Sequence, residues 1–179
     1  MIEPVFRGVI NRVCALLARI VPGAQTARVA LHRLRGVHLG KDVFISQDVI
    51  LETAYPELIT IGDRTCIGTR VIIIAHMREL SRGVNIESDV FIGPGAIILP
   101  DVTIGHGSVV TAGSVVTRSV PAMTVVQGNP AVPVATCGVP LTADTTMKEF
   151  SRRLKPLTAR VTASRQQSES VIGTHASML

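Results

Sequence analysis

The sequence has very few aromatic residues: one tyrosine, four phenylalanines and no tryptophan among 179 residues. Aliphatic side chains must therefore supply nearly all of the core of what, at this length, should be a single domain. Cysteines are also few and scattered, at positions 14, 66 and 137. Their number and spacing fit neither a disulfide framework nor a zinc site. We therefore expect a protein of a reducing compartment, the cytoplasm.

Long apolar runs are missing too, since no stretch of 18 apolar residues occurs, and no membrane-spanning helix is expected. Arg7, Arg12 and Arg19 interrupt the apolar stretches near the N-terminus, and no cleavage-like site follows them, which argues against a signal peptide. The net charge of +5 would suit a phosphate-bearing ligand or a membrane surface. Basic residues without interleaved aromatics argue against a nucleic-acid partner.

What the sequence does contain is a short repeat over residues 86–121. Each of six consecutive blocks begins with Ile or Val and carries a small or β-branched residue in its fifth slot: IESDVF, IGPGAI, ILPDVT, IGHGSV, VTAGSV and VTRSVP. β-branched residues favour extended backbone, and the Gly, Asp, Pro and Ser between them supply tight corners. A side chain every sixth residue then faces one central axis, where its burial contributes roughly 1.5–3 kcal/mol. A period of six predicts a parallel β-helix.

The same pattern begins further upstream, at Leu39. A first coil reads LGKDVF, ISQDVI and LETAYP, and after a small insertion at 57–60 a second reads IGDRTC, IGTRVI and IIAHMR. The repeat fails directly after His76, and residues 77–85 have no six-residue register. With the two coils formed by the six regular blocks, the sequence predicts about four coils.

Both flanks of the repeat predict helices. The apolar spacing in residues 1–36, broken at Pro22–Gly23, predicts two helices. They would either cap the open edge of the first coil or form a basic amphipathic element lying on a membrane. We favour the cap, and the two interpretations are compatible.

Beyond the repeat, Thr146–Glu149 fits a capping box and predicts a short helix to about Leu154. Residues 161–179 are polar and are expected to be disordered. The predicted organisation is a helical cap at 1–36, a β-helix domain at 37–134, and a C-terminal helix with a flexible tail at 135–179.

The blocks, with the VVQGNPAVPV that follows them, resemble the hexapeptide-repeat acyltransferases, in particular the galactoside, maltose and polysaccharide O-acetyltransferases. The resemblance covers about 39–134. It implies an all-β fold, a left-handed parallel β-helix. It also implies acetyl-CoA as donor, no metal, and a homotrimer with each active site between neighbouring β-helices. The implied reaction is acetyl transfer to a hydroxyl of a sugar or glycan precursor in polysaccharide biosynthesis, in the cytoplasm or at the inner face of the membrane.

Among the five histidines, His76 stands out because it directly precedes the break in the repeat, and excursions from a regular solenoid are where binding loops occur. In the resembled family the catalytic histidine lies at the end of a coil just before such a loop. We therefore expect His76 to be the general base, since imidazole has an ordinary pKa near 6.5 and can take a hydroxyl proton at neutral pH. Glu79, Glu52 or a backbone carbonyl could orient the ring.

The resemblance also suggests residues that would hold the donor. Ala112 matches a position whose backbone meets the pantetheine arm, and Thr117 and Arg118 match a Thr-Lys pair near the nucleotide phosphates. In the resembled family, the residue at the position of Pro94 donates a hydrogen bond to the oxyanion or holds the pantetheine. Pro94 has no N–H, so either Gly95 donates instead or the donor lies elsewhere.

For the acceptor, Arg70 matches a position where related sugar acetyltransferases often carry an asparagine that touches the sugar. Glu79 lies in the loop 77–85, which would shape the acceptor site together with the first coil. The basic residues of these segments suggest an acidic or phosphate-linked glycan.

Proteins with the same fold can have two other functions. A γ-type carbonic anhydrase needs three zinc-binding histidines, and only His76 is suitably placed, so we reject that function. A non-catalytic β-helix that acts as an assembly or scaffold subunit stays open as the alternative.

Overall fold

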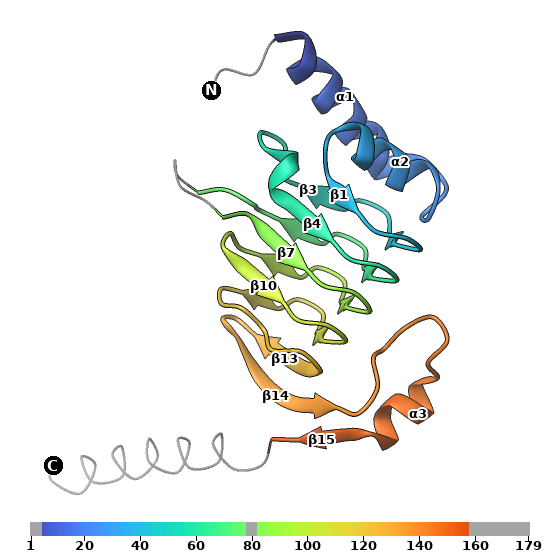
Figure 1. Ribbon diagram of the computed structural model, residues 1–179, viewed down its shortest axis with the longest axis vertical. Helices are drawn as coiled ribbons and strands as arrows, with labels where there is room; N and C mark the ends of the chain where they lie inside the picture. Colours follow the sequence, from blue (N-terminus) through green and yellow to red (C-terminus); the bar gives the residue numbers. More distant parts are fainter. Residues whose placement is uncertain (1–4, 78–81, 158–179) are drawn as a thin grey trace, which may run out of the picture.

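The computed structural model describes residues 5–77 and 82–157. The chain forms a stack of coils with α1 (Val5–Ile20) and α2 (Ala27–Leu34) at one end and α3 (Met147–Arg152) at the other (Figure 1). A short 3₁₀ helix, Pro56–Leu58, follows the first coil and takes up the predicted insertion. This is a left-handed parallel β-helix with flanking helices, so the predicted fold class is confirmed.

Each coil contributes one short strand to each of three parallel sheets. The first sheet contains β1 (His38–Leu39), β4 (Ile59–Ile61), β7 (Val84–Ile86) and β10 (Val102–Ile104). The second sheet begins with β2 (Phe44–Ile45), β5 (Cys66–Ile67), β8 (Phe91–Ile92) and β11 (Val109–Val110). The third contains β3 (Ile50–Leu51), β6 (Ile72–Ile73), β9 (Ile97–Ile98) and β12 (Val115–Val116). The described chain therefore has the four coils expected from the repeat.

The first residue of each block forms the core. In the second sheet the register pairs Ile45 with Ile67, Ile67 with Ile92, and Ile92 with Val110, and all four side chains are fully buried. The other two sheets build equivalent columns. The core is thus made of aliphatic side chains that contact the same slot one coil above and below, which explains why so few rings are present.

The fourth slot of most blocks turns the corner with a positive φ. Non-glycine residues there have φ between 54° and 63°: Asp42, Asp48, Arg64, Arg70, Asp89 and Asp101. Glycines at the same slot have φ between 65° and 69°: Gly95, Gly107 and Gly113. Asp and Gly adopt this left-handed conformation more readily than most residues. His76 occupies the same slot but is not in this set, because the chain leaves the coil there.

After the fourth coil the chain extends the second sheet in a way that the sequence did not predict. β13 (Thr124–Gly128) pairs in parallel with β11, and β14 (Ala131–Cys137) turns back antiparallel to it. A turn at Asn129 and Pro130 joins these two strands. The Thr146 hydroxyl accepts a hydrogen bond from the Glu149 N–H, as expected for the capping box, but α3 ends at Arg152. Instead of continuing the helix, β15 (Leu154–Pro156) pairs with the edge of β14. The tail predicted at 161–179 lies outside the described residues.

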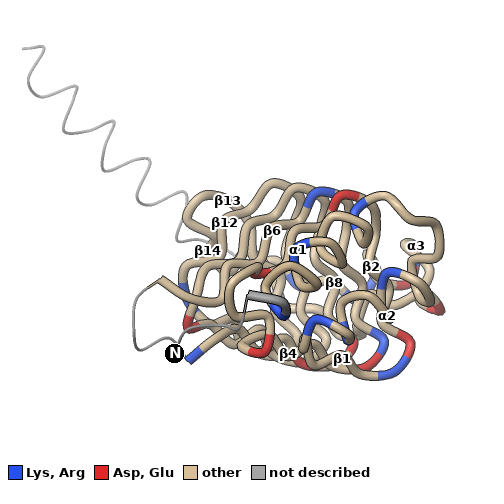
Figure 2. Tube along the Cα trace, turned by 90° about the horizontal axis from the view of Figure 1, so that it is seen from above, with Lys and Arg blue, Asp and Glu red and all other residues tan. Residues whose placement is uncertain are grey.

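The N-terminal helices lie over the first coil. α2 contacts β1 and β2, and α1 contacts β3. Seen from above, α1 lies across the coils (Figure 2). The Ile45 N–H donates to the Ala24 carbonyl, and Arg28 Nη1 donates to the Ile45 carbonyl at 3.1 Å. The helices and the segment that connects them therefore satisfy backbone groups that the first coil would otherwise leave unpaired. None of the described helices has the length and apolar character needed to cross a bilayer.

Neighbouring residues of β7 test the stacked core. Ile86 is fully buried, whereas Asn85 points outward and is exposed. Because Ile86→Ala leaves a cavity in a column that cannot collapse, it should cost about 2–5 kcal/mol of unfolding free energy. Asn85→Ala should change it by less than about 0.5 kcal/mol. Urea unfolding of both variants is the measurement, and equal effects would contradict the stacked core.

Candidate active site

The structure places the predicted site residues that it describes at the two corners that border the third sheet. His76 lies at the corner that follows this sheet, between β6 and β7, and Thr117 and Arg118 lie at the same corner two coils further on. Arg70, Gly95 and Ala112 lie at the corner that precedes the sheet, in successive coils. The predicted residues therefore form two rows on either side of one face of the prism.

At the first corner, His76 makes a close contact with a buried carboxylate. His76 Nδ1 lies 2.7 Å from Glu52 Oε2, and the Glu52 side chain is only 8% exposed. Oε1 of Glu52 accepts the Ala54 N–H at 2.9 Å, and Oε2 also accepts the Ala75 N–H at 3.2 Å. The Tyr55 ring packs edge-on against the imidazole, with the ring centroids 4.8 Å apart. Of the three candidate partners named from the sequence, Glu52 is the one that orients His76.

These contacts determine the charge and the tautomer of the pair. Burial alone would raise the pKa of Glu52, but the hydrogen bonds from Ala54, His76 and Ala75 together lower it below its ordinary value. Glu52 is therefore ionised at neutral pH and can only accept hydrogen bonds. Nδ1 of His76 consequently carries the hydrogen, and Nε2 is the nitrogen able to take up a proton. The His76 side chain is 35% exposed, so an acceptor can reach it from solvent.

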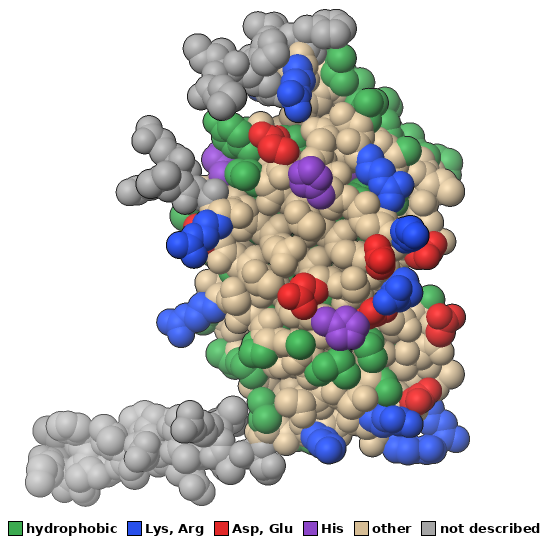
Figure 3. Space-filling model, in the orientation of Figure 1, with side chains coloured by type: hydrophobic (Ala, Val, Ile, Leu, Met, Phe, Trp, Pro, Cys, Tyr) green, Lys and Arg blue, Asp and Glu red, His purple; other side chains and the backbone are tan. Residues whose placement is uncertain are grey.

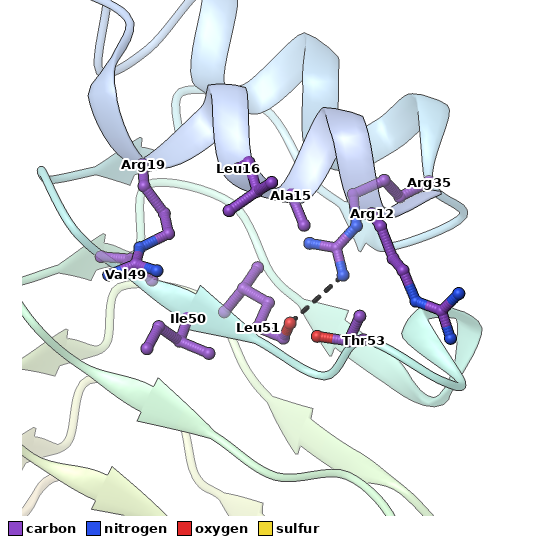
Figure 4. Close-up of a pocket in the computed structure, with 9 residues that line it drawn as sticks. All are labelled: Arg12, Ala15, Leu16, Arg19, Arg35, Val49, Ile50, Leu51 and Thr53. Carbon is purple, nitrogen blue, oxygen red and sulfur yellow. Dashed lines mark hydrogen bonds between the residues drawn. The ribbon is translucent and has the colours of Figure 1, made fainter. Parts of the chain in front are cut away.

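The N-terminal helices hold the strand end that carries Glu52. Arg35 is buried and donates from Nη2 to the Glu52 carbonyl at 2.6 Å and to the Leu51 carbonyl at 3.2 Å. Figure 4 shows its side chain reaching Leu51 beside a cavity of about 280 Å³ between α1 and β3. Asn11 of α1 donates to the Thr53 carbonyl at 2.5 Å and accepts from Arg35 Nε at 2.7 Å. The carboxylate is thus anchored through its backbone to both helices.

A second histidine, His32, completes this buried cluster. Its Nδ1 lies 3.1 Å from Arg35 Nη1, and because guanidinium is a donor only, Nδ1 must be the acceptor. Burial, helped by the neighbouring Arg35 charge, lowers the pKa of His32 from 6.5 to about 3. His32 is therefore neutral in the folded protein, and its Nε2 is buried with no hydrogen-bond partner.

The second corner has an open surface of small residues. A side-chain carbon built at Gly95 or Gly113 would meet no atom within 4 Å, and Ala112 beside them is exposed. A narrow, extended ligand could lie along such a surface. The Gly95 N–H donates to the Thr69 carbonyl at 2.9 Å, so it is already used between coils and is not a ready oxyanion donor. Arg70 is 79% exposed, and its Nε lies 3.6 Å from Asp48.

The remaining predicted site residues are exposed or lie outside the described residues. Thr117 and Arg118 are exposed at the corner after β12, where a cation could meet a phosphate. Glu79 lies outside the described residues. Within the described part of the chain, no group of three or more His, Cys, Asp or Glu side chains could hold a metal ion.

Known proteins share this sequence pattern. Residues 83–118 match the family model described as bacterial transferase hexapeptide, six repeats. The Bacillus subtilis protein named "Putative acetyltransferase YvoF" is 34% identical over 131 residues, which cover 71% of this chain and 76% of that protein. This chain belongs to the hexapeptide-repeat acyltransferase family.

Two further comparisons agree with this family. "Putative acetyltransferase C18B11.09c" of Schizosaccharomyces pombe is 37% identical over 110 residues, covering 55% of this chain, and the match spans about half, 52%, of that protein's length. The structure superposes on the crystal structure of the hexapeptide-repeat acetyltransferase VCA0836 of Vibrio cholerae with a TM-score of 0.60 and 25% sequence identity. The superposition covers 74% of this chain and 91% of the Vibrio cholerae chain.

Sequence reasoning missed Asn11, His32 and Arg35, which support the site from the N-terminal helices. The one available signal was the presence of polar residues on the helix faces that turn out to be buried. On a helical wheel such residues are indistinguishable from a solvated face until the packing partner is known.

The buried histidine predicts a pH-dependent loss of stability. Because its pKa is lower in the folded state than in the unfolded chain, the unfolded chain binds more protons below pH 6.5. The contribution of neutral His32 to the free energy of unfolding is complete above about pH 6.5. It is lost as the pH falls toward 3, and the total loss is at most about 4–5 kcal/mol. Urea unfolding between pH 7 and pH 4 measures this loss.

Two glutamine variants separate this effect from general acid unfolding. His32→Gln should flatten the dependence between pH 6.5 and 4, whereas His38→Gln, at an exposed site, should leave it unchanged. Equal slopes in the wild-type protein and His32→Gln would show that His32 is not the responsible group.

Proposed function

We propose that this chain is an acetyl-CoA-dependent O-acetyltransferase that acts on a hydroxyl of a sugar or glycan precursor, in polysaccharide biosynthesis, with His76 as general base. The observation that carries the proposal is the 2.7 Å contact between His76 Nδ1 and the buried, ionised Glu52 at the point where the coil opens. Family membership supports the acyl-transfer chemistry. The sugar acceptor is supported by the resemblance of the repeat and GNPA segment to sugar acetyltransferases.

In this mechanism His76 Nε2 takes the proton of the acceptor hydroxyl while the oxygen attacks the acetyl carbonyl, and later returns it to the departing thiolate. Glu52 keeps the proton of Nδ1 in place and stabilises the imidazolium that forms. The acetyl group passes directly from sulfur to oxygen, so the protein forms no covalent intermediate. General-base assistance of this kind contributes about 10²–10⁴-fold to the rate.

The donor, acetyl-CoA, supplies the thioester. The open surface of Gly95, Ala112 and Gly113 fits an extended pantetheine arm, because no side chain obstructs it. Thr117 and Arg118 would meet the nucleotide phosphates. Arg70 and Glu79 would contact the acceptor, together with the loop after His76.

A homotrimer would unite the two rows of residues. His76 and Ala112 lie at different corners of one protomer, so a site between neighbouring β-helices can use His76 of one subunit and the small-residue corner of the next. We propose that this trimer works in the cytoplasm, with the N-terminal helices at the inner face of the membrane.

Substitution of the pair tests the chemistry. His76→Ala should lower kcat for acetyl-CoA-dependent acetylation by about 10²–10⁴-fold, because the base is lost. Glu52→Gln should lower it by at least about tenfold, because a neutral amide no longer stabilises the imidazolium. Thiol release with a panel of sugar acceptors is the assay.

His106→Ala is the matched control, since His106 lies at another corner and is half exposed near Asp89. It should keep wild-type turnover. Turnover by His76→Ala at the wild-type rate would contradict the proposal, and the absence of any calorimetric heat with acetyl-CoA would favour the scaffold alternative.

Mixing two inactive variants tests the shared site. His76→Ala removes the base, and Ala112→Trp would block the donor arm. If each site draws these residues from different subunits, denaturing and refolding a 1:1 mixture should restore about a quarter of the wild-type activity, because random trimers rebuild intact sites. Activity that stays at the level of the separate variants would place both residues in one subunit's site or rule out the trimer.

A further inference from the structure

The outward face of α1 is apolar along its whole described length. The inner face packs against α2 and the first coil through small residues: Gly8, Asn11, Cys14 and Ala18. The opposite face exposes six aliphatic side chains, Val9, Ile10, Val13, Leu16, Leu17 and Ile20. At about 100° per residue these six fall within an arc of about 120° on the side of α1 opposite the buried residues, and Leu16 at its edge also lines the cavity between α1 and β3. Leu16 is 62% exposed and Ile20 75% exposed.

No other part of the described chain covers this stripe. Figure 3 shows hydrophobic side chains gathered along the edge of the molecule over the N-terminal helices. A soluble surface rarely exposes a contiguous apolar patch of this kind unless something binds it. Since the inner face already packs α1 against the protein, most of the outer aliphatic surface is left free to contact another surface.

Positive charge borders the stripe. Residues 5–36 contain six arginines and no acidic residue. On the helical wheel, Arg12 and Arg19 lie along one side of the stripe, whereas Arg7, near the start of the helix, falls between Cys14 and Ala18. Arg19 pairs with Asp48, whereas Arg7 and Arg12 are exposed. Two copies of this face would bring like charges together, so a second copy is a poor occupant and an anionic surface is a good one.

We propose that α1 docks the protein on an anionic lipid bilayer, with the stripe of six aliphatics inserted between the headgroups and the arginines at the lipid phosphates. An apolar face, a basic border and a 16-residue length are the properties of a helix that lies in the interface plane. The inference deepens the location given in the proposed function and names the lipid chemistry, but it needs no catalytic activity.

Docking through this face would hold the candidate site close to the membrane. Asn11, on the inner side of α1, bonds the Thr53 carbonyl, one residue from Glu52. A helix is about 10–12 Å across, so the bilayer would lie about one helix diameter from the Glu52–His76 pair. Acceptor hydroxyls carried at the membrane surface would then be within its reach.

Sedimentation with vesicles tests the proposal on the full chain. Wild-type protein should sediment with vesicles of equal parts phosphatidylglycerol and phosphatidylcholine, and much less with phosphatidylcholine alone. The double variant Leu16→Glu/Ile20→Glu should weaken binding by at least about tenfold, because it places charge in the apolar stripe. Met147→Glu is the matched control, since Met147 is equally exposed but lies on α3 at the other end of the molecule.

A second variant covers the possibility that the glutamates disturb folding. Arg7→Ala/Arg12→Ala leaves the apolar stripe intact and should still weaken binding to the anionic vesicles. Wild-type protein that stays in the supernatant with anionic vesicles would overturn the proposal. So would a Leu16→Glu/Ile20→Glu protein that folds but changes its oligomeric state by light scattering, because the stripe would then be a subunit contact. Neither result would change the outcome of the acetyl-transfer assays, so the two proposals are tested separately.

Discussion

The requirement that each coil stack on an identical coil governs this structure. Ile45, Ile67, Ile92 and Val110 occupy one column because their strands pair in exact register, and the same holds on the other two faces. A column of this kind tolerates neither a ring nor a shift of one residue. The core is therefore regular, and chemical variety is confined to the corners, where side chains point outward.

The same regularity makes the departure at His76 informative. The fourth slot normally needs a left-handed backbone, which Asp and Gly supply at most corners. His76 stands at that slot without the left-handed conformation, and its ring instead turns to a carboxylate that is itself buried. A regular corner could not present an imidazole in this way, because the chain would continue directly into the next strand. The break in the repeat and the His–Glu contact are thus one feature.

Much of this could be predicted from the sequence, because a period of six is specified locally and repeated. The four coils, their inward residues and the position of His76 at the break in the repeat all follow from that register. The partner of His76 could not be predicted in the same way. Glu52 is separated from His76 by one whole coil along the chain, and the two meet only because the coils stack directly on one another. The strands after Pro121 were missed for a related reason. β14 and β15 pair with a sheet edge that exists only once the coils have formed.

An open-ended stack also needs something at its first coil, and this need links the fold to the site. The helices that satisfy the backbone of the first coil are the same elements that hold the Leu51–Thr53 segment through Asn11 and Arg35. His32 can accept a hydrogen bond from Arg35 only because its ring is neutral. Neutral His32 therefore supports the position of Glu52 indirectly, through Arg35, and the two side chains need not touch. The end cap of this β-helix is in that sense a part of the candidate active site. Substitutions in the cap should first change the orientation of His76.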